Sequence, residues 1–169
     1  MKLICNNIYT TLRRFESFRE FSIFINNQSI NSLSLKTIGD AYYCLSIHDA
    51  LTQEEIKRIN FCSDKMEEDL NILLWHNARL LVIDTGVQVY FINSEYTVSA
   101  SFEITTPLIG FYVTKNNNLL ILEEATLQLV TSRGNILKNK AFDMIEKFSI
   151  KDDVLSIITC DETIVVPLS

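Results

Sequence analysis

The residue types that carry catalysis or ligate metals are few in this sequence, and their spacing fits no common site. Its histidines and cysteines are His48, His76, Cys5, Cys44, Cys62 and Cys160. The nearest approach to a metal site is Cys44-x-x-x-His48, with Asp49 adjacent and Cys62 further along. Structural zinc sites use four ligands, usually as two close pairs, and the second pair is missing here. We therefore expect no metal site.

A catalytic dyad built on these residues is not expected either. Residues 41–47 read as a strand, on which Cys44 and His48 would lie roughly 13 Å apart, too far for a hydrogen bond. His76 falls at a predicted hairpin turn. The four glycines are isolated in the chain, so they form no phosphate-binding loop. The sequence thus predicts no catalytic residue and no cofactor, and a protein that is not an enzyme.

Acidic residues are the more informative charged group. The net charge of −6 argues against a nucleic-acid partner, because phosphate neutralisation needs clustered lysine and arginine. Adjacent carboxylates on a strand point to opposite faces, so doublets such as Glu123-Glu124 are interpreted as solvated turn residues. An acidic surface instead favours a basic protein partner. The predicted partner-binding residues are Glu54, Glu55, Asp64, Glu67, Glu68, Asp69, Asp152, Asp153, Asp161 and Glu162.

The sequence predicts neither a signal peptide for export nor a membrane-spanning segment. The first residues, MKLICNN, lack the apolar core of roughly 7–15 residues that a signal peptide needs. Apolar runs such as 80–83 and 119–122 are far shorter than the roughly 18 residues of a membrane span. We expect a cytoplasmic protein whose cysteines are reduced, mostly buried thiols.

Strand-like runs that repeat along the chain are expected to position these residues. Residues 70–91, 108–130 and 145–166 each read as strand, turn, strand, turn, strand. Their period of roughly 36–40 residues is typical of propeller blades. Two further strand-like runs, 97–104 and 135–142, follow the first and second units. Each unit with its link therefore supplies about four short antiparallel strands.

The first seventy residues are less regular. Arg19–Ile25 alternates like a strand, as do 30–35 and 41–47. Thr52 and Glu55 match a capping box, which predicts one or two short helices over residues 52–69. The expected fold class is mainly β (β-rich α+β), an antiparallel meander of about ten or more short strands that forms a curled sheet or an open half-propeller.

The domain organisation follows from length and regularity. A chain of 169 residues is expected to form a single domain, 1–169. Within it we distinguish an irregular α/β part, 1–69, from a repetitive β-meander, 70–169.

The repeated units resemble the blades of β-propellers. Residues 80–92 and 119–131 each pair an apolar strand with a turn and a second strand, and the resemblance covers residues 70–168. It lacks a Trp-Asp or Gly-Gly blade signature, and its three regular units fall short of the typical 4–8 blades of a closed ring. The resemblance implies a binding scaffold rather than a reaction.

By general profile alone, the chain is similar to bacterial immunity proteins, which are small, often acidic and neutralise a toxin inside the producing cell. This resemblance implies a cytoplasmic protein that binds a basic, nuclease-type toxin domain through carboxylates that imitate phosphates. The alternative is another β-scaffold interaction module or a subunit of a complex. An enzyme with an unrecognised site is a third hypothesis, and the oligomeric state stays open.

Overall fold

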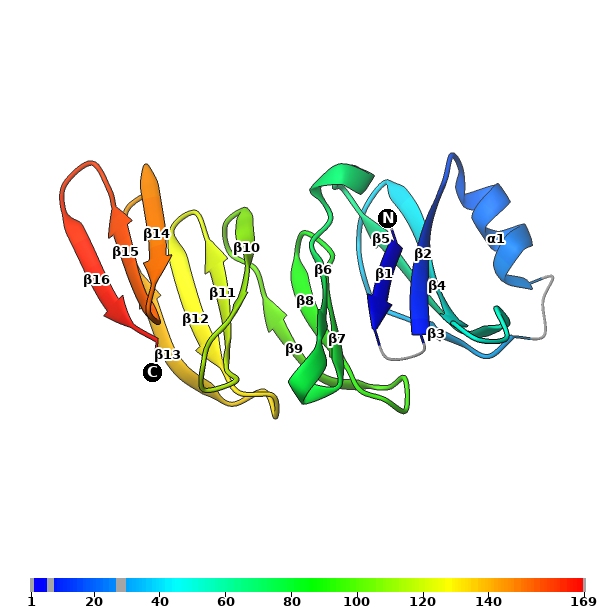
Figure 1. Cartoon of the computed structure of the whole chain (residues 1–169). Helices are drawn as coiled ribbons and strands as arrows, with labels where there is room; N and C mark the ends of the chain where they lie inside the picture. Colours follow the sequence, from blue (N-terminus) through cyan, green and yellow to red (C-terminus); the bar gives the residue numbers. More distant parts are fainter. Residues whose placement is uncertain (1, 6–7, 27–29, 169) are drawn as a thin grey trace.

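The computed structural model describes residues 2–5, 8–26 and 30–168, and short antiparallel strands dominate it (Figure 1). Three consecutive stretches each form a meander, in which strands adjacent in the chain are adjacent in the sheet. Sheet 2 contains β6 (Ile72–Trp75), β7 (Leu80–Asp84), β8 (Gln88–Ile92) and β9 (Val98–Glu103). Sheet 3 contains β10 (Leu108–Val113), β11 (Leu119–Glu123), β12 (Thr126–Val130) and β13 (Ile136–Ala141). Sheet 4 contains β14 (Lys147–Lys151), β15 (Val154–Ile158) and β16 (Thr163–Pro167).

The repeat predicted over residues 70–168 is confirmed by this topology. Sheets 2, 3 and 4 follow one another across the molecule as an open succession of blade-like units (Figure 1). The backbone repeats as well, because a left-handed residue shortly precedes the second strand of each unit: Arg79 (φ 54°), Asn117 (φ 57°) and Asp153 (φ 57°). Asparagine and aspartate tolerate this conformation, which lets the chain turn without glycine. The mainly β fold class is therefore confirmed.

Sheet 1 precedes the repeat and has a different topology. Its strand order is β1-β2-β4-β5-β3, with β3 parallel to β5 and the other pairs antiparallel. Its strands are β1 (Lys2–Cys5), β2 (Ile8–Phe15), β3 (Ser32–Ser34), β4 (Ala41–Asp49) and β5 (Glu55–Ser63). The helix α1 (Phe18–Asn26) lies beside this sheet at the end of the molecule remote from sheet 4 (Figure 1).

The strand predicted at Arg19–Ile25 is wrong, because this segment is α1. The spacing of its apolar residues fits both a strand and a helix. In the structure Phe21 and Phe24 lie on one helical face and pack against Phe15, with ring centroids 5.4 and 5.0 Å from the Phe15 ring. Ser17 caps the helix, since its Oγ accepts a hydrogen bond from the Glu20 N–H (3.3 Å). Ser17 and Glu20 have the spacing of a capping box.

The helix predicted to begin at Thr52 is also wrong, because residues 55–63 form β5. The Asp49 carboxylate accepts the N–H groups of Leu51 and Thr52 at 2.7 and 2.9 Å, which closes a tight turn between β4 and β5. Residues 55–63 then pair with β4 along their length. Within residues 52–69 only the three-residue turn η1 (Glu67–Asp69) is helical. A second three-residue turn, η2 (His76–Ala78), links β6 and β7. Pairing in the sheet overrides the local capping signal.

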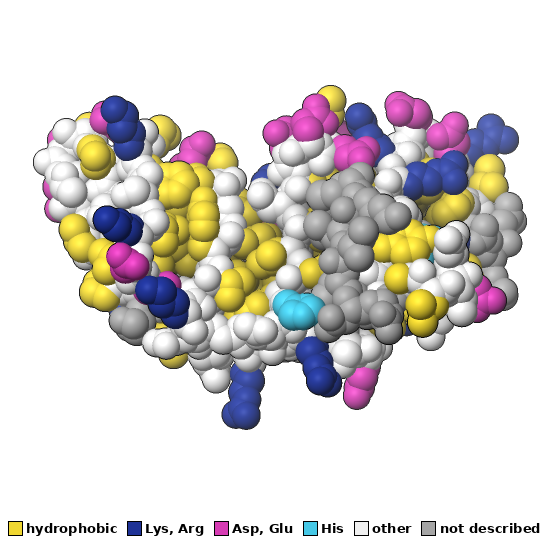
Figure 2. Space-filling view, viewed as in Figure 1, with side chains coloured by type: hydrophobic (Ala, Val, Ile, Leu, Met, Phe, Trp, Pro, Cys, Tyr) yellow, Lys and Arg dark blue, Asp and Glu magenta, His cyan; other side chains and the backbone are white. Residues whose placement is uncertain are grey.

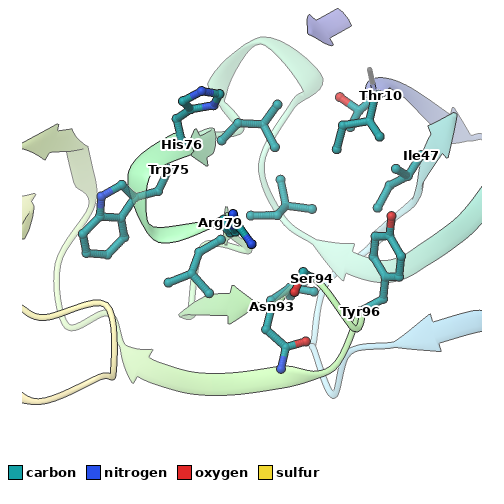
Figure 3. Close-up of a pocket in the computed structure, with 13 residues that line it drawn as sticks. Thr10, Ile47, Trp75, His76, Arg79, Asn93, Ser94 and Tyr96 are labelled. Atoms are coloured by element: carbon teal, nitrogen blue, oxygen red, sulfur yellow. The ribbon is translucent and has the colours of Figure 1, made fainter. Parts of the chain in front are cut away.

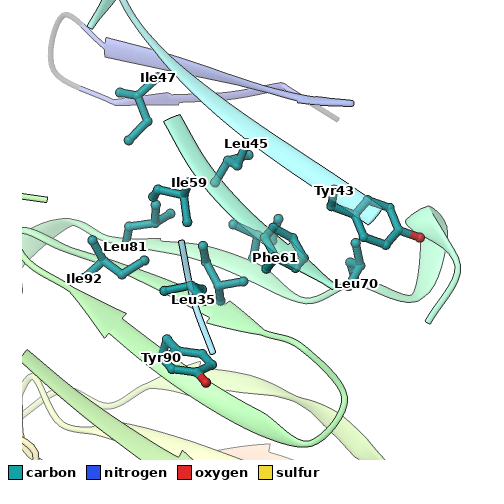
Figure 4. Close-up of a cluster of buried hydrophobic side chains, with 12 residues drawn as sticks. Leu35, Tyr43, Leu45, Ile47, Ile59, Phe61, Leu70, Leu81, Tyr90 and Ile92 are labelled. Atoms are coloured by element: carbon teal, nitrogen blue, oxygen red, sulfur yellow. The ribbon is translucent and has the colours of Figure 1, made fainter. Parts of the chain in front are cut away.

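Apolar side chains fill the spaces between successive sheets. Figure 4 shows the cluster between sheets 1 and 2, where Leu45 and Ile59 meet Leu81 and Ile92. Every residue of β7 and β11 is buried, because neighbouring sheets cover both faces of these strands. Burial in β15 alternates instead, as expected for a strand with one covered face. No helix of the described residues is long and apolar enough to cross a membrane.

Candidate protein-binding surface

The first strands of the three repeated sheets present a row of sheet edges. Within the described residues β6 pairs only with β7, β10 only with β11, and β14 only with β15. Each first strand therefore keeps one side on which a further strand could add. We call these three strands the inner strands.

Contacts between turns hold the inner strands beside one another. The indole Nε1–H of Trp75, at the end of β6, donates to Asn117 Oδ1 in the turn after β10 (2.8 Å). The backbone N–H of Lys115 in that same turn donates to Asp153 Oδ2 in the turn after β14 (2.9 Å). The Lys115 ammonium also lies 3.5 Å from the Asp152 carboxylate. These bonds link sheet 2 to sheet 3 and sheet 3 to sheet 4 at one common rim.

The side chains of the inner strands are largely apolar. Val113 on β10 is 43% exposed and Phe148 on β14 is 37% exposed. The Tyr112 and Phe148 rings meet edge to face with centroids 6.0 Å apart, which joins β10 to β14. Figure 2 shows hydrophobic side chains gathered over sheets 3 and 4, where this face of the molecule is hollowed. A partly exposed aromatic surface beside open strand edges is suited to protein binding.

Two fully buried carboxylates position the segments that lead into the inner strands. Asp84, at the end of β7, contacts the Lys65 ammonium and Asn71 Nδ2, both in the segment before β6. Glu123, at the end of β11, accepts the N–H groups of Thr105 and Thr106 at 2.7 and 2.8 Å, just before β10. These residues occupy equivalent places in two repeats.

The interpretation of Glu123 as a solvated turn residue is therefore wrong, since its exposed fraction is 0%. The sequence does contain an indication that both acids are buried. Asp84 directly follows the apolar run 80–83, and Glu123 directly follows the apolar run 119–122; both runs are fully buried. A carboxylate there needs internal donors because water does not reach it.

The predicted acidic residues do not form one patch, and the first two are set apart. Glu54 and Glu55 lie at the start of β5. The nine residues of this strand separate them from the other acidic residues of the span 52–69. Glu55 Oε2 lies 2.5 Å from Nη2 of the buried Arg58. A β-bulge opposite Ile47 and His48 lets these i,i+3 residues meet. Burial acts to raise the pKa of Glu55, but its hydrogen bonds and the Arg58 charge outweigh burial and lower it.

Four other acids gather beyond the far end of β5. Asp64, Glu67, Glu68 and Asp69 fall within six residues, and acidic side chains are seen together in this part of the surface (Figure 2). Burial raises the pKa of the neighbouring Tyr43 phenol, and the charges of η1 raise it further. We call these four residues the acidic turn.

The remaining four predicted acids lie in sheet 4, in the turns at the two ends of β15. Asp152 and Asp153 precede the strand and contact Lys115, so they take part in the rim contacts. Asp161 and Glu162 follow it and are exposed. The donor atoms of Asp143, Cys160 and Asp161 lie within 4.8 Å of one another, but all three side chains are exposed to solvent.

The histidine and cysteine singled out by sequence have structural surroundings. Cys44 and His48 both lie on β4, as predicted. The His48 ring stacks on Tyr9, with centroids 4.7 Å apart, and bonds to Thr11 Oγ1 at 3.0 Å. Cys44 is fully buried, and burial raises the pKa of its thiol to about 11. Such a thiol is a poor nucleophile near neutral pH.

Comparison with known proteins identifies no family for this chain. No protein-family model matches it, and no curated protein matches it. The solved structures that match include the crystal structure of BamB from Moraxella catarrhalis, with a TM-score of 0.49 and 13% identity. The match covers 74% of this chain and 39% of that one, so the chain spans well under half of the protein it matches.

Proposed function

We propose that this chain is a non-enzymatic scaffold that binds a protein partner at its inner strands. The observation that carries the proposal is the row of three first strands whose second side has no strand partner among the described residues. An extended segment can add to such an edge through backbone hydrogen bonds, with pockets for alternate side chains giving specificity. Val113 and Phe148 would supply the apolar contacts.

The test is capture of the partner by variants that change this surface. The double variant Val113→Asp and Phe148→Asp puts charge where apolar contacts are expected, and it should weaken partner binding by about thirtyfold or more if these are central contacts. The matched control is Val165→Asp, since Val165 is 61% exposed on β16, away from the inner strands. Equal binding by both variants and the unmodified protein would rule out the inner strands as the binding surface.

The acidic turn favours a second candidate, a toxin-neutralising protein that binds a basic toxin domain. Support for it is the gathering of Asp64, Glu67, Glu68 and Asp69 at one surface of a protein with net charge −6. Charge reversal at Glu67, Glu68 and Asp69 should lower the association rate and the salt dependence of binding. Reversal of Asp161 and Glu162 is the control, and equal effects of both sets would contradict this candidate.

Both candidates are proposed to act in the cytoplasm. Cys44, Cys62 and Cys160 are free thiols. A reducing compartment such as the cytoplasm keeps thiols in this form. A neighbouring reading frame with a toxin-like domain would support the second candidate over the first.

A further inference from the structure

A cavity of about 270 Å³ lies between sheet 1 and sheet 2, and among the inner strands β6 contributes Leu74 and Trp75 to its lining. Its apolar lining includes Ile8 and Ile47 from sheet 1 and Leu74, Leu81 and Ile92 from sheet 2. The turn after β8 and the η2 turn line it as well. Figure 3 shows Thr10 and Ile47 on one side of this space and Trp75 and His76 on the other. A concave, mostly apolar space with a few polar groups is the usual form of a small-molecule site.

Thr10 provides a polar group with no partner inside this cavity. The residue is 1% exposed, and its Oγ1 has no hydrogen-bond partner in the described structure. A buried hydroxyl without a partner is costly, so native structures normally satisfy it. Thr10 lines the cavity, and the Tyr96 hydroxyl points toward the same side (Figure 3). An oxygen of a bound ligand could satisfy the Thr10 hydroxyl.

Arg79 provides the charge. It lines the cavity, its side chain is exposed, and none of the ion pairs of the described residues involves it. Its backbone is held in the left-handed region (φ 54°) as the cap of η2, and its N–H bonds to the His76 carbonyl at 3.0 Å. An exposed guanidinium beside an apolar cavity suits a carboxylate, which it can bind through paired hydrogen bonds.

We propose that this cavity binds a small carboxylate with an apolar body and a hydroxyl or carbonyl oxygen at its buried end. The carboxylate binds Arg79, the body packs against Ile47, Leu81 and Ile92, and the buried oxygen contacts the Thr10 hydroxyl. This site goes beyond the proposed protein-binding function. It shares Leu74 and Trp75 of β6 with the inner strands, but its lining does not include Val113 or Phe148, the residues that test that function.

The single tryptophan offers a direct readout, since Trp75 lines the cavity. Three matched probes are titrated at low salt: 8-hydroxyoctanoate, octanoate, and octane-1,8-diol. Binding is followed by Trp75 fluorescence and by backbone amide NMR shifts. We expect saturable binding in the order hydroxy acid, then acid, then diol, with shifts centred on residues 74–81 and 92–96. Absence of saturable changes in both measurements, or equal binding of acid and diol, would overturn the proposal.

Two variants assign the contacts. Arg79→Gln should weaken binding of both carboxylates about tenfold, as expected for a hydrogen bond to a charged group, and leave the diol unchanged. Arg133→Gln, at another exposed arginine, is the control. Thr10→Val should weaken only the hydroxy acid, to the affinity of octanoate, and should raise the melting temperature of the ligand-free protein. If Thr10→Val leaves the hydroxy acid bound as before, the buried oxygen contact is wrong.

Discussion

Glu123 shows how a single residue fixes the spacing between two repeats. Its Oε2 accepts four hydrogen bonds, from the N–H and hydroxyl groups of Thr105 and Thr106, at 2.7 to 3.4 Å. The side chain belongs to sheet 3, while its donors lie in the segment that leaves sheet 2. Loss of the carboxylate would remove the acceptor of these N–H groups, which belong to the exposed Thr105 and the half-buried Thr106.

Glu123→Ala is therefore expected to lower the free energy of unfolding by about 2 to 3 kcal/mol, because it removes hydrogen bonds to a charged group. The measurement is urea unfolding at neutral pH. Glu124→Ala is the matched control, because Glu124 is the next residue and only half-buried. A loss for Glu123→Ala no larger than that of the control would contradict the positioning role of Glu123.

Cysteine reactivity tests the burial of β4. The Cys44 thiol has a pKa raised to about 11 by burial, so at pH 8 only about one in a thousand of these groups is a thiolate. Cys160 is exposed and should react with a disulfide reagent much faster. Mass spectrometry of the labelled peptides after short exposure checks this order. Labelling of Cys44 as fast as Cys160 in the folded protein would contradict it.

At the scale of elements, the repeat could be predicted from sequence and the helix could not. Apolar runs such as 80–83 and 119–122, followed by polar turns, indicate the strands directly, because strands buried on both faces are continuously apolar. The spacing of Phe21 and Phe24 fits a helix, while the spacing of Phe21 and Ile23 fits a strand. Packing against Phe15 therefore selects the helix, and the sequence alone does not report this contact. The inner strands and the Thr10 cavity depend on distant pairings, which no local pattern reports.

The two capping signals can be separated by substitution. Ser17→Ala should destabilise the protein by about 1 kcal/mol, because it removes the acceptor for the first turn of α1. Thr52→Ala should have a smaller effect, since Thr52 lies in an exposed turn whose N–H groups are bound by Asp49. Chemical denaturation of both variants makes the comparison. A larger loss for Thr52→Ala would contradict the assignment of the helix.

At the scale of the whole molecule, we propose that sheets 1 to 4 form a single domain. The cluster between sheets 1 and 2 draws buried residues from both sides of residue 70, including Ile59 and Leu81. Shared burial of this kind couples the unfolding of neighbouring repeats.

Unfolding followed by Trp75 fluorescence and by far-ultraviolet circular dichroism should therefore give one coincident transition. Ile59→Val, in sheet 1, should lower the stability reported by Trp75 in sheet 2 by about 1 kcal/mol. Trp75 unfolding that is unaffected by Ile59→Val would show that the two parts unfold independently.

The central claim is that a protein partner binds the inner strands, and site-specific photo-crosslinking tests it most directly. A photoreactive residue is placed in turn at Val113, Phe148 and the control position Val165, in the protein as its own cells produce it. We predict that positions 113 and 148 crosslink to one and the same protein, while position 165 does not. Crosslinks to that protein from position 165 alone, or from neither inner strand, would contradict the claim.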